Sequence, residues 1–595
     1  MSRDEHTVGC DLMLRLARTS SIVFNQLKYY GSPRPVFSSL RGTICTTRSL
    51  PHRAFSSITE SQNDLYDYTS GRWVYNDALR HKERRVVFDV DGLRQLAAES
   101  VKQSPADVLS LHKLAEGGFN RTFLVALRDG RQVVARIPYP ITVPHYYAVA
   151  CEVATMEYQR SCGIPVPKIY GYSADSNNVA GTPYIFMEFI RGPKLGDVWP
   201  SLGDDEVISV IRQLTQLESR MMSRPFPAGG SLYFTEDLEK VAPGLGVPLE
   251  DKRFCVGPDT KLALWYGRRA GLDVYRGPYH SAEEALAVAA QKEIAYLKQF
   301  GQPLLPLRRE RRPSYKYQQQ SPLDHVENLQ QYLSITSSLV PKDPALNRFY
   351  IRHPDLHPNN IFVSWSPGSD CKIVSVFDWQ HTSILPMFLL AGIPQRLQNH
   401  ADAVSQSMTL PSRPENLDQM GGREGQRDDE EYRYRLRLVH YHYVVSTMEC
   451  NPLHYAAFTD RLFALRGRLF LHAGGPWEGE SFDLKAALIQ ATNKWEELTG
   501  GVVPRLCPIE FGTKDLNEMA ELDKEMSETT RGFELLQAMR GIGEEGWVPV
   551  EDYEDTVAFL KQFKEESLAG AESVEEREEI MDQWPWEDMD EEMYM

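Results

Sequence analysis

The chain has 595 residues, 42% of them hydrophobic and 25% charged, which is enough for two to four ordinary domains or one large elaborated domain. This composition excludes collagen-like, wholly disordered and small disulfide-stabilised proteins. The 82 acidic residues outnumber the 65 Lys and Arg residues, and the formal net charge of -17 argues against general nucleic-acid binding. No apolar stretch is long enough for a transmembrane helix, and the eight scattered cysteines form no CxxC pair, as expected in a reducing compartment.

The N-terminal segment is basic. Residues 12–59 contain no Asp or Glu but seven Lys and Arg residues among many Ser and Thr residues, which is typical of a mitochondrial transit peptide. The segment RAFSS, residues 53–57, resembles sites that matrix proteases cut two residues after an arginine. We therefore predict a transit peptide over residues 1–55 and a location in mitochondria, in the matrix. An ordinary disordered basic tail is the alternative.

A short sheet-forming region follows an N-terminal extension over residues 56–110. Alternating apolar residues indicate strands, and the dipeptide Asp129-Gly130 suits the positive φ angles of a tight hairpin turn. Apolar residues at helical spacing indicate one helix within this region. The predicted elements are strands over 122–127 and 132–137, a helix over 147–162, and strands over 168–172 and 184–189.

After residue 191 the apolar periodicity is mainly helical, so a small sheet-rich lobe (residues 111–191) is expected to precede a large helical lobe (residues 192–545). This order predicts an α+β fold with two lobes. Residues 397–429, rich in Pro, Gly, Asn, Arg and Asp, are expected to form a flexible surface insertion. The predicted helices are 205–221, 281–300, 431–449, 483–498 and 515–539.

The C-terminal segment, residues 546–595, is strongly acidic. From Glu565 onward it carries thirteen acidic residues against the single Arg577. Such a charge run predicts a solvated extension. The sequence Trp584-Pro585-Trp586 is the feature that disorder does not explain.

The residues with the clearest chemistry lie in the segment RHPDLHPNNIFV, residues 352–363. His353, Asp355 and Asn360 form the pattern H-x-D-x-x-x-x-N, in which a loop carboxylate accepts or orients a hydroxyl proton and an amide oxygen reaches a metal ion. Asp378 follows an apolar run over 373–377, where it could hold Mg²⁺ against phosphates. The H-x-D-x-x-x-x-N pattern and Asp378 together predict a phosphate-transfer site.

These segments resemble the aminoglycoside phosphotransferase and choline kinase-like enzymes, which are relatives of the protein kinases. Four segments are similar in particular to the fungal mitochondrial group called altered inheritance of mitochondria protein nine. They are residues 114–138, the segment GIPVPKIYGYS, the stretch from FCVGP to GPYHS, and the segment DWQHTSILP. The resemblance covers residues 75–540. It implies a bilobal protein kinase-like fold, ATP and Mg²⁺ as cofactors, and phosphate transfer to a hydroxyl or amine of a small molecule.

By this resemblance Asp355 is the catalytic base, His353 supports the loop, and Asn360 and Asp378 bind Mg²⁺. His357, two residues after Asp355, lies where protein kinases often place a lysine, and a protonated histidine there could neutralise the transferred phosphate. The inserted residues 253–298 correspond to helices that line the acceptor pocket in such enzymes.

The resemblance also assigns nucleotide-binding residues. Gly117, Gly118 and Asn120 form a turn that could cover phosphates, and Arg136 lies where protein kinases carry a phosphate-binding lysine. Glu152 falls on the apolar stripe of its helix, so a buried cation such as Arg136 would explain it; Glu157 is the alternative. Residues 187–190, with Glu188 and Ile190, would form the hinge that binds the adenine edge.

Two other interpretations remain open at this point. His353, Asp355 and His357 could form an H-x-D-x-H zinc cluster for hydrolysis. Alternatively, the short glycine turn and the arginine at position 136 are compatible with a nucleotide-binding pseudokinase that acts as a scaffold. The sequence identifies neither the small-molecule acceptor nor any protein partner.

Overall fold

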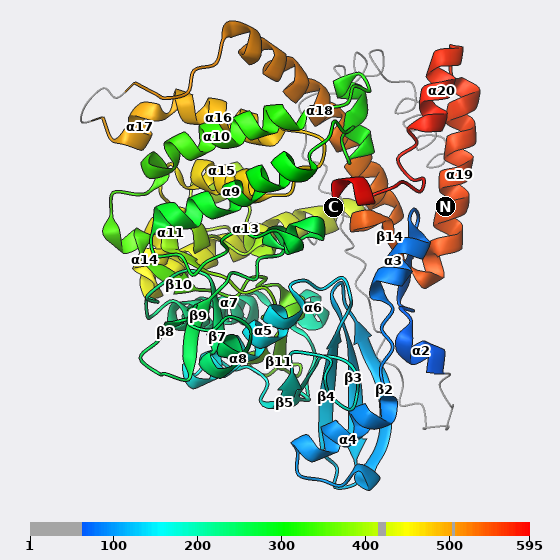
Figure 1. The fold of residues 1–595 in the computed structure, drawn as a ribbon, viewed down its shortest axis with the longest axis vertical. Helices are drawn as coiled ribbons and strands as arrows, with labels where there is room; N and C mark the ends of the chain where they lie inside the picture. The colour runs from blue at the N-terminus through cyan, green and yellow to red at the C-terminus, as the bar shows by residue number, and fades with distance from the viewer. Residues whose placement is uncertain (1–61, 415–423, 502–505) are drawn as a thin grey trace.

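The computed structural model describes residues 62–414, 424–501 and 506–595 (Figure 1). The predicted transit peptide, residues 1–55, lies outside the described residues. The chain forms a small sheet-rich lobe and a large helical lobe, which confirms the predicted α+β, bilobal fold. Among the described residues, no helix combines the length and the apolar composition that a bilayer span requires.

The small lobe contains a five-stranded antiparallel sheet in the order β2-β3-β4-β6-β5. β3 and β4 form the expected hairpin, with Gly130 in its turn at a φ of 85°. The prediction lacked β2, an edge strand in which only Leu111 is fully buried. The strands are β2 (Val108–Glu116), β3 (Asn120–Leu127), β4 (Gln132–Pro138), β5 (Ile169–Ser173) and β6 (Tyr184–Glu188).

Different helices cover the two faces of this sheet, because successive side chains of a strand point to opposite faces. Phe123 packs in one core with helix α4 (Val90–Ser100), whereas Leu124 packs in another with α5 (His145–Ser161). The second core continues into the large lobe and includes Leu356 and Trp379, which lie beside the predicted catalytic residues. The core between the lobes therefore anchors both catalytic segments.

The large lobe consists mainly of helices that pack around α9 and α10. The five predicted helices are present, but the fourth is divided into α16 and α17 at Lys494. Short two- and three-stranded sheets connect the helices. The main helices are α7 (Asp204–Met221), α9 (Ala282–Phe300), α10 (Pro322–Leu339), α13 (Glu424–Cys450), α15 (Phe463–Gly474), α16 (Phe482–Asn493), α17 (Trp495–Thr499) and α18 (Thr513–Arg540).

The expected insertion over residues 397–429 is partly ordered against the large lobe. Leu397 is buried, and Asp402 accepts a hydrogen bond from Arg437 Nη2 on α13 at 2.7 Å. Residues 415–423 lie outside the described residues, and α13 begins at Glu424. Only the middle of the predicted insertion therefore lacks a described structure.

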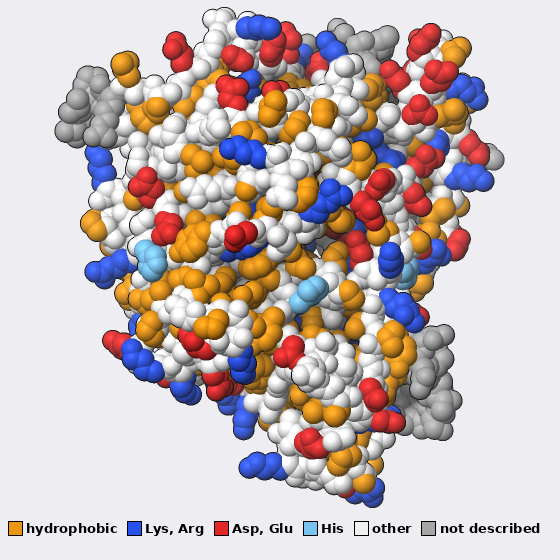
Figure 2. Space-filling model, viewed as in Figure 1, with side chains coloured by type: hydrophobic (Ala, Val, Ile, Leu, Met, Phe, Trp, Pro, Cys, Tyr) orange, Lys and Arg blue, Asp and Glu red, His pale blue; other side chains and the backbone are white. Residues whose placement is uncertain are grey.

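Residues 546–595 are not a solvated extension, which corrects the expectation from their charge. Trp584 and Trp586 are each 7% exposed and pack with Phe563 in a separate hydrophobic core. Acidic side chains lie on the outer surface over the C-terminal helices (Figure 2). The segment contains β14 (Trp547–Pro549), which pairs with β1 (Gly71–Trp73), and helices α19 (Tyr553–Gly570) and α20 (Val574–Asp582).

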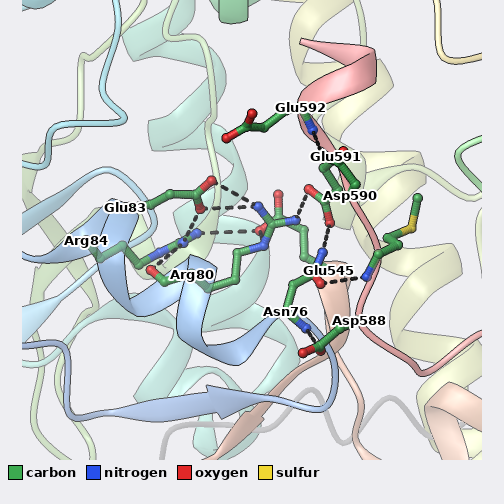
Figure 3. Close-up of polar contacts among 10 residues, drawn as sticks. Asn76, Arg80, Glu83, Arg84, Glu545, Asp588, Asp590, Glu591 and Glu592 are labelled. Carbon is green, nitrogen blue, oxygen red and sulfur yellow. Dashed lines mark hydrogen bonds and ion pairs between the residues drawn. The ribbon is translucent and has the colours of Figure 1, made fainter.

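Polar contacts attach this C-terminal segment to helix α3 (Asp77–Arg84) of the N-terminal extension (Figure 3). Glu591 accepts hydrogen bonds from Arg80 Nη2 and Asn76 Nδ2, both at 2.6 Å. Asp588 Oδ1 accepts the backbone N–H of Asn76 at 2.5 Å. The Arg80 and Glu591 side chains are only 6% and 8% exposed. The two ends of the described chain therefore form one folded unit, which we call the terminal clamp.

We expect Arg80→Met to lower the free energy of unfolding by about 3 kcal/mol or more, because it leaves buried carboxylates without their cation. Arg80 also faces Glu83 at 3.2 Å and Glu545 at 3.6 Å. Because these carboxylates remain when Glu591 is replaced, Glu591→Gln should lower the free energy of unfolding by less than Arg80→Met does. Urea unfolding of the full chain, followed by tryptophan fluorescence, measures both. The control is Glu592→Gln, at an exposed neighbouring position. Equal stabilities of Arg80→Met and Glu592→Gln would contradict the terminal clamp.

Candidate active site

Two short strands bring the separated motif residues together. The H-x-D-x-x-x-x-N loop lies between β10 (Phe349–Ile351) and β11 (Ile361–Ser364), and β12 (Lys372–Val376) leads to Asp378. β11 and β12 are antiparallel, and the Phe377 N–H donates to the Asn360 carbonyl at 3.1 Å. The seventeen residues between Asn360 and Asp378 thus form a hairpin that brings Asp378 back beside the loop.

His353 holds the start of this loop from inside the protein. It is 3% exposed, and its Nδ1 accepts the backbone N–H of Asp355 at 3.1 Å. Its Nε2 lies 3.0 Å from the Phe377 carbonyl, so the proton of the neutral ring is on Nε2. Burial lowers the pKa of His353, which keeps the ring neutral and preserves both bonds. His353 therefore fixes the backbone that carries Asp355 to the backbone that carries Asp378.

Asp355 and Asn360 lie side by side at the surface of the loop. Asn360 Nδ2 donates to the Asp355 carbonyl oxygen at 3.0 Å and to its Oδ2 at 3.1 Å. These bonds orient the amide. Its Oδ1 accepts no hydrogen bond from the described residues and is free for a ligand. The second carboxylate oxygen of Asp355 is also left without a donor there, and the residue is exposed.

Arg136 joins the small lobe to the hairpin. Its Nη1 lies 2.9 Å from Glu152 Oε1 on α5, and its Nη2 lies 2.5 Å from Asp378 Oδ1. The arginine therefore pairs with Glu152 and not with Glu157. Asp378 has a left-handed backbone with a φ of 69°, a conformation that costs energy for a non-glycine residue and is often found at functional sites.

The cluster of Arg136, Glu152 and Asp378 has one cation for two carboxylates. Burial opposes ionisation of Asp378, but the neighbouring guanidinium outweighs it and lowers the pKa of this carboxyl. Burial raises the pKa of Glu152 to about 7; Arg136 opposes this shift and the negative charge of Asp378 adds to it. With both carboxylates ionised, the cluster has a net negative charge that an additional cation would relieve.

The predicted glycine turn is closed by its own hairpin. The Gly117 N–H donates to the Asn120 carbonyl at 2.9 Å and is not free to bind phosphate, whereas Gly118 has open space around it. Asn120 Nδ2 donates to Gln380 Oε1 at 3.0 Å, and Arg136 Nη2 donates to the same oxygen at 2.9 Å. Gln380, which sequence analysis did not identify, therefore links the turn to the segment that follows Asp378.

The predicted hinge follows β6. The backbone N–H of Glu188 donates to the Lys168 carbonyl at 2.9 Å, so this group belongs to the sheet. Among the described residues, neither backbone group of Ile190 takes part in a hydrogen bond. Ile190 is thus better placed than Glu188 to offer backbone groups to a ligand.

The neighbours of His357 do not favour a protonated, positively charged ring. Its Nε2 lies 3.1 Å from Arg396 Nε, and its Nδ1 lies 3.2 Å from the Asn359 N–H. Both neighbours are donors, so a protonated ring would leave both without an acceptor. Burial, assisted by Arg396, lowers the pKa of His357. The exposed Arg396, which sequence analysis did not identify, supplies the permanent positive charge beside this loop.

The zinc-cluster interpretation does not fit these contacts. Both ring nitrogens of His353 are occupied by backbone groups, and those of His357 face N–H donors. Within the described residues, no group of three or more His, Cys, Asp and Glu side chains could hold a metal ion. The alternative of a hydrolytic zinc centre is therefore wrong for these residues.

A second buried ion pair holds the start of the H-x-D-x-x-x-x-N loop, and the sequence analysis did not predict it. Arg352 Nε donates to Glu218 Oε1 on α7 at 2.7 Å, and the Tyr443 hydroxyl on α13 donates to Glu218 Oε2 at 2.7 Å. Glu218 is 1% exposed and lies on the apolar stripe of α7, the same signal that identified Glu152. The loop over residues 352–360 is therefore positioned by helices of the large lobe as well as by its own hairpin.

Arg269 and Arg276, in the inserted residues 253–298, are buried or stacked and do not line a charged pocket. Arg269 is fully buried and donates to Glu293 Oε1 at 2.6 Å. Arg276 stacks over Trp265, with its guanidinium carbon 4.1 Å from the ring centroid. These arginines are already neutralised or stacked, so they do not indicate an anionic acceptor.

Comparison with known proteins identifies relatives of the whole chain. The profile described as the phosphotransferase enzyme family matches residues 110–388. A subtelomeric hrmA-associated cluster protein of Aspergillus fumigatus is 30% identical over 516 residues, which are 80% of this chain and 96% of that protein. The mitochondrial protein of Yarrowia lipolytica named altered inheritance of mitochondria protein 9 is 24% identical over 544 residues, 85% of this chain and 88% of its own.

Among solved structures, choline kinase from Cryptosporidium parvum aligns with 76% of this chain and 98% of its own, at 8% identity and a TM-score of 0.28. That score is too low to support an inference. The profile match covers the region that contains Asp355, Asn360 and Asp378, and the sequence matches extend over most of the chain. Residues 110–388 therefore form a domain of the phosphotransferase enzyme family, and the chain is a homologue of the subtelomeric hrmA-associated cluster protein and of the fungal proteins named altered inheritance of mitochondria protein 9.

Proposed function

We propose that the protein is an ATP- and magnesium-dependent phosphotransferase that acts on a hydroxyl or amine group of a small molecule. The observation that carries this proposal is that one hairpin holds two side-chain pairs, Asp355 with Asn360 and Asp378 with Arg136 of the small lobe. An exposed carboxylate, an oriented amide and a carboxylate beside a fixed cation are the groups that phosphate transfer requires.

In the proposed reaction, the acceptor hydroxyl donates a hydrogen bond to the carboxylate oxygen of Asp355 that Asn360 leaves free. The hydroxyl oxygen then bonds to the γ-phosphorus while the bond from that phosphorus to the β-phosphate oxygen breaks. The proton passes to Asp355, and ADP leaves with the electron pair of the broken bond. Arg136 Nη2 must leave Asp378 and Gln380 before the planar guanidinium can donate two parallel hydrogen bonds to phosphate oxygens.

The residues present fit a magnesium ion. Asn360 Oδ1 and Asp378 Oδ2 accept no hydrogen bond from the described residues, and hard oxygen ligands of this kind suit Mg²⁺. The negative charge of the Arg136, Glu152 and Asp378 cluster also favours a cation. Bound there, Mg²⁺ would neutralise charge on the phosphates.

A nucleotide-binding pseudokinase that acts as a scaffold is the second candidate. Arg136 replaces the usual lysine and pairs with Asp378 directly at 2.5 Å, so it competes with a metal for that carboxylate. If nucleotide binding cannot break this contact, the site would bind ligands without transferring phosphate.

We place the protein in the mitochondrial matrix. The support is the acid-free basic composition of residues 12–59, together with the mitochondrial relatives of several yeasts. N-terminal sequencing of protein isolated from mitochondria should find a mature chain that begins near Ser56. Detection in the cytosol alone, or a mature chain that begins before Arg34, would contradict this location.

We expect ATP with Mg²⁺ to raise the melting temperature, because a ligand that binds only the folded state stabilises it by about 2.7 kcal/mol at one hundred times its Kd. Asp378→Asn should remove the magnesium-dependent part of the shift. Asp370→Asn, in the exposed turn between β11 and β12, is the matched control and should leave the shift unchanged. No shift for the unmodified protein at millimolar ATP would exclude both the kinase and the nucleotide-binding scaffold.

Asp355→Asn should separate the two candidates. The variant keeps the size of the side chain but loses the basic oxygen, so ATP should still raise the melting temperature while phosphate transfer falls by about two orders of magnitude. Transfer is measured with radiolabelled ATP and a mitochondrial metabolite extract. In a deletion strain at matched protein levels, full rescue by Asp355→Asn would favour the scaffold.

A further inference from the structure

A cavity of about 480 Å³ lies outside the proposed phosphotransferase site. It is enclosed by the helical turn over Arg309–Tyr315, by α18, α19 and α20, and by the sequence Trp584-Pro585-Trp586. In Figure 1, α18 and the C-terminal helices that border it are the orange and red elements. None of the residues assigned to the nucleotide or to Mg²⁺ lines it. We call it the acidic-aromatic cavity.

Aromatic side chains form much of its wall. Phe533 stacks on Trp586 with ring centroids 5.1 Å apart and planes inclined by 16°, and Phe563 lies 5.4 Å from Trp584. Tyr317 lines the same space. The faces of aromatic rings are the negative part of their quadrupole, so rings around a cavity attract a cation with an apolar body.

Carboxylates form another part of the wall. None of the six glutamates forms an ion pair with a described Lys or Arg residue. The cation in the wall, Arg309, is already engaged, since its guanidinium donates to the carbonyl oxygens of Trp584 and Asp588. Arg309 keeps its positive charge, and Arg308, Arg311 and Arg312 act on Glu310, but the six carboxylates still outnumber the single guanidinium in the wall. The glutamates are Glu310, Glu525, Glu528, Glu575, Glu576 and Glu579.

Two polar groups in the wall also lack partners. Trp586 is 7% exposed, and its indole N–H has no acceptor among the described residues. The Ser314 hydroxyl is buried without a partner in the same part of the chain. Because both atoms are buried beneath the cavity surface, the groups that a ligand can reach are the aromatic rings and the carboxylates.

We propose that the acidic-aromatic cavity binds a small organic cation, an ammonium compound with an apolar body, independently of the phosphotransferase site. The volume is within the range of small-molecule sites, and the wall combines apolar contact with a few polar groups, as such sites do. Aromatic rings would contact the apolar body and the carboxylates would balance the charge.

The test is calorimetric titration of the full chain at low salt with benzyltrimethylammonium, with benzyl alcohol as the neutral probe and phenylacetate as the anion. We expect the cation to bind and the other two probes to bind at least tenfold more weakly. Glu528→Gln combined with Glu579→Gln should weaken cation binding at least tenfold. The matched control is Glu578→Gln, an exposed residue of α20 outside the cavity, which should bind as the unmodified protein does.

Thr529→Arg provides a second variant, because it would place a cation inside the wall and should abolish binding even if the double variant folds poorly. Melting temperatures of both variants check that they remain folded. Equal affinity for the three probes, or cation binding that all the variants retain, would overturn the proposal. Binding of a basic amphipathic peptide at this cavity, without binding of the small cation, would also overturn it.

Discussion

The arrangement of the site depends on the guanidinium of Arg136, which pairs with both Glu152 and Asp378. A buried charge must be paired, and the carboxylates that pair with Arg136 come from α5 in the small lobe and from the hairpin in the large lobe. A planar guanidinium can serve several acceptors at fixed angles, which a lysine ammonium cannot do in the same way. The position of Asp378 relative to the sheet is therefore set by electrostatics as much as by packing.

The same physical rule recurs elsewhere in the protein. Arg352 pairs with Glu218 beneath the catalytic loop, and Arg269 pairs with Glu293 among the helices. Apolar burial drives compaction but has little directional preference, whereas a buried ion pair is favourable in few geometries. Each pair joins elements that are distant in sequence. These pairs therefore fix the orientation of elements that the hydrophobic cores merely bring together.

Sequence patterns could predict the elements with strong periodicity and the residues of the phosphate-transfer motif. Glu152 was also predictable, because a charge on an apolar stripe requires a partner, and Glu218 carries the same signal. Gln380 and Arg396 were not predictable, since their contacts depend on how loops meet. The C-terminal segment was misjudged because local acidity outweighed Trp584 and Trp586, whose burial depends on partners far along the chain.

The terminal clamp has a consequence for the order of folding. Asn76 and Glu591 are 515 residues apart, so α3 cannot reach its native partners until the C-terminal segment has left the ribosome. At usual rates of synthesis, that interval lasts roughly 25 to 100 seconds. During this time α4 can already pack on the sheet of the small lobe, whereas α3 still lacks the carboxylates that bind Asn76 and Arg80.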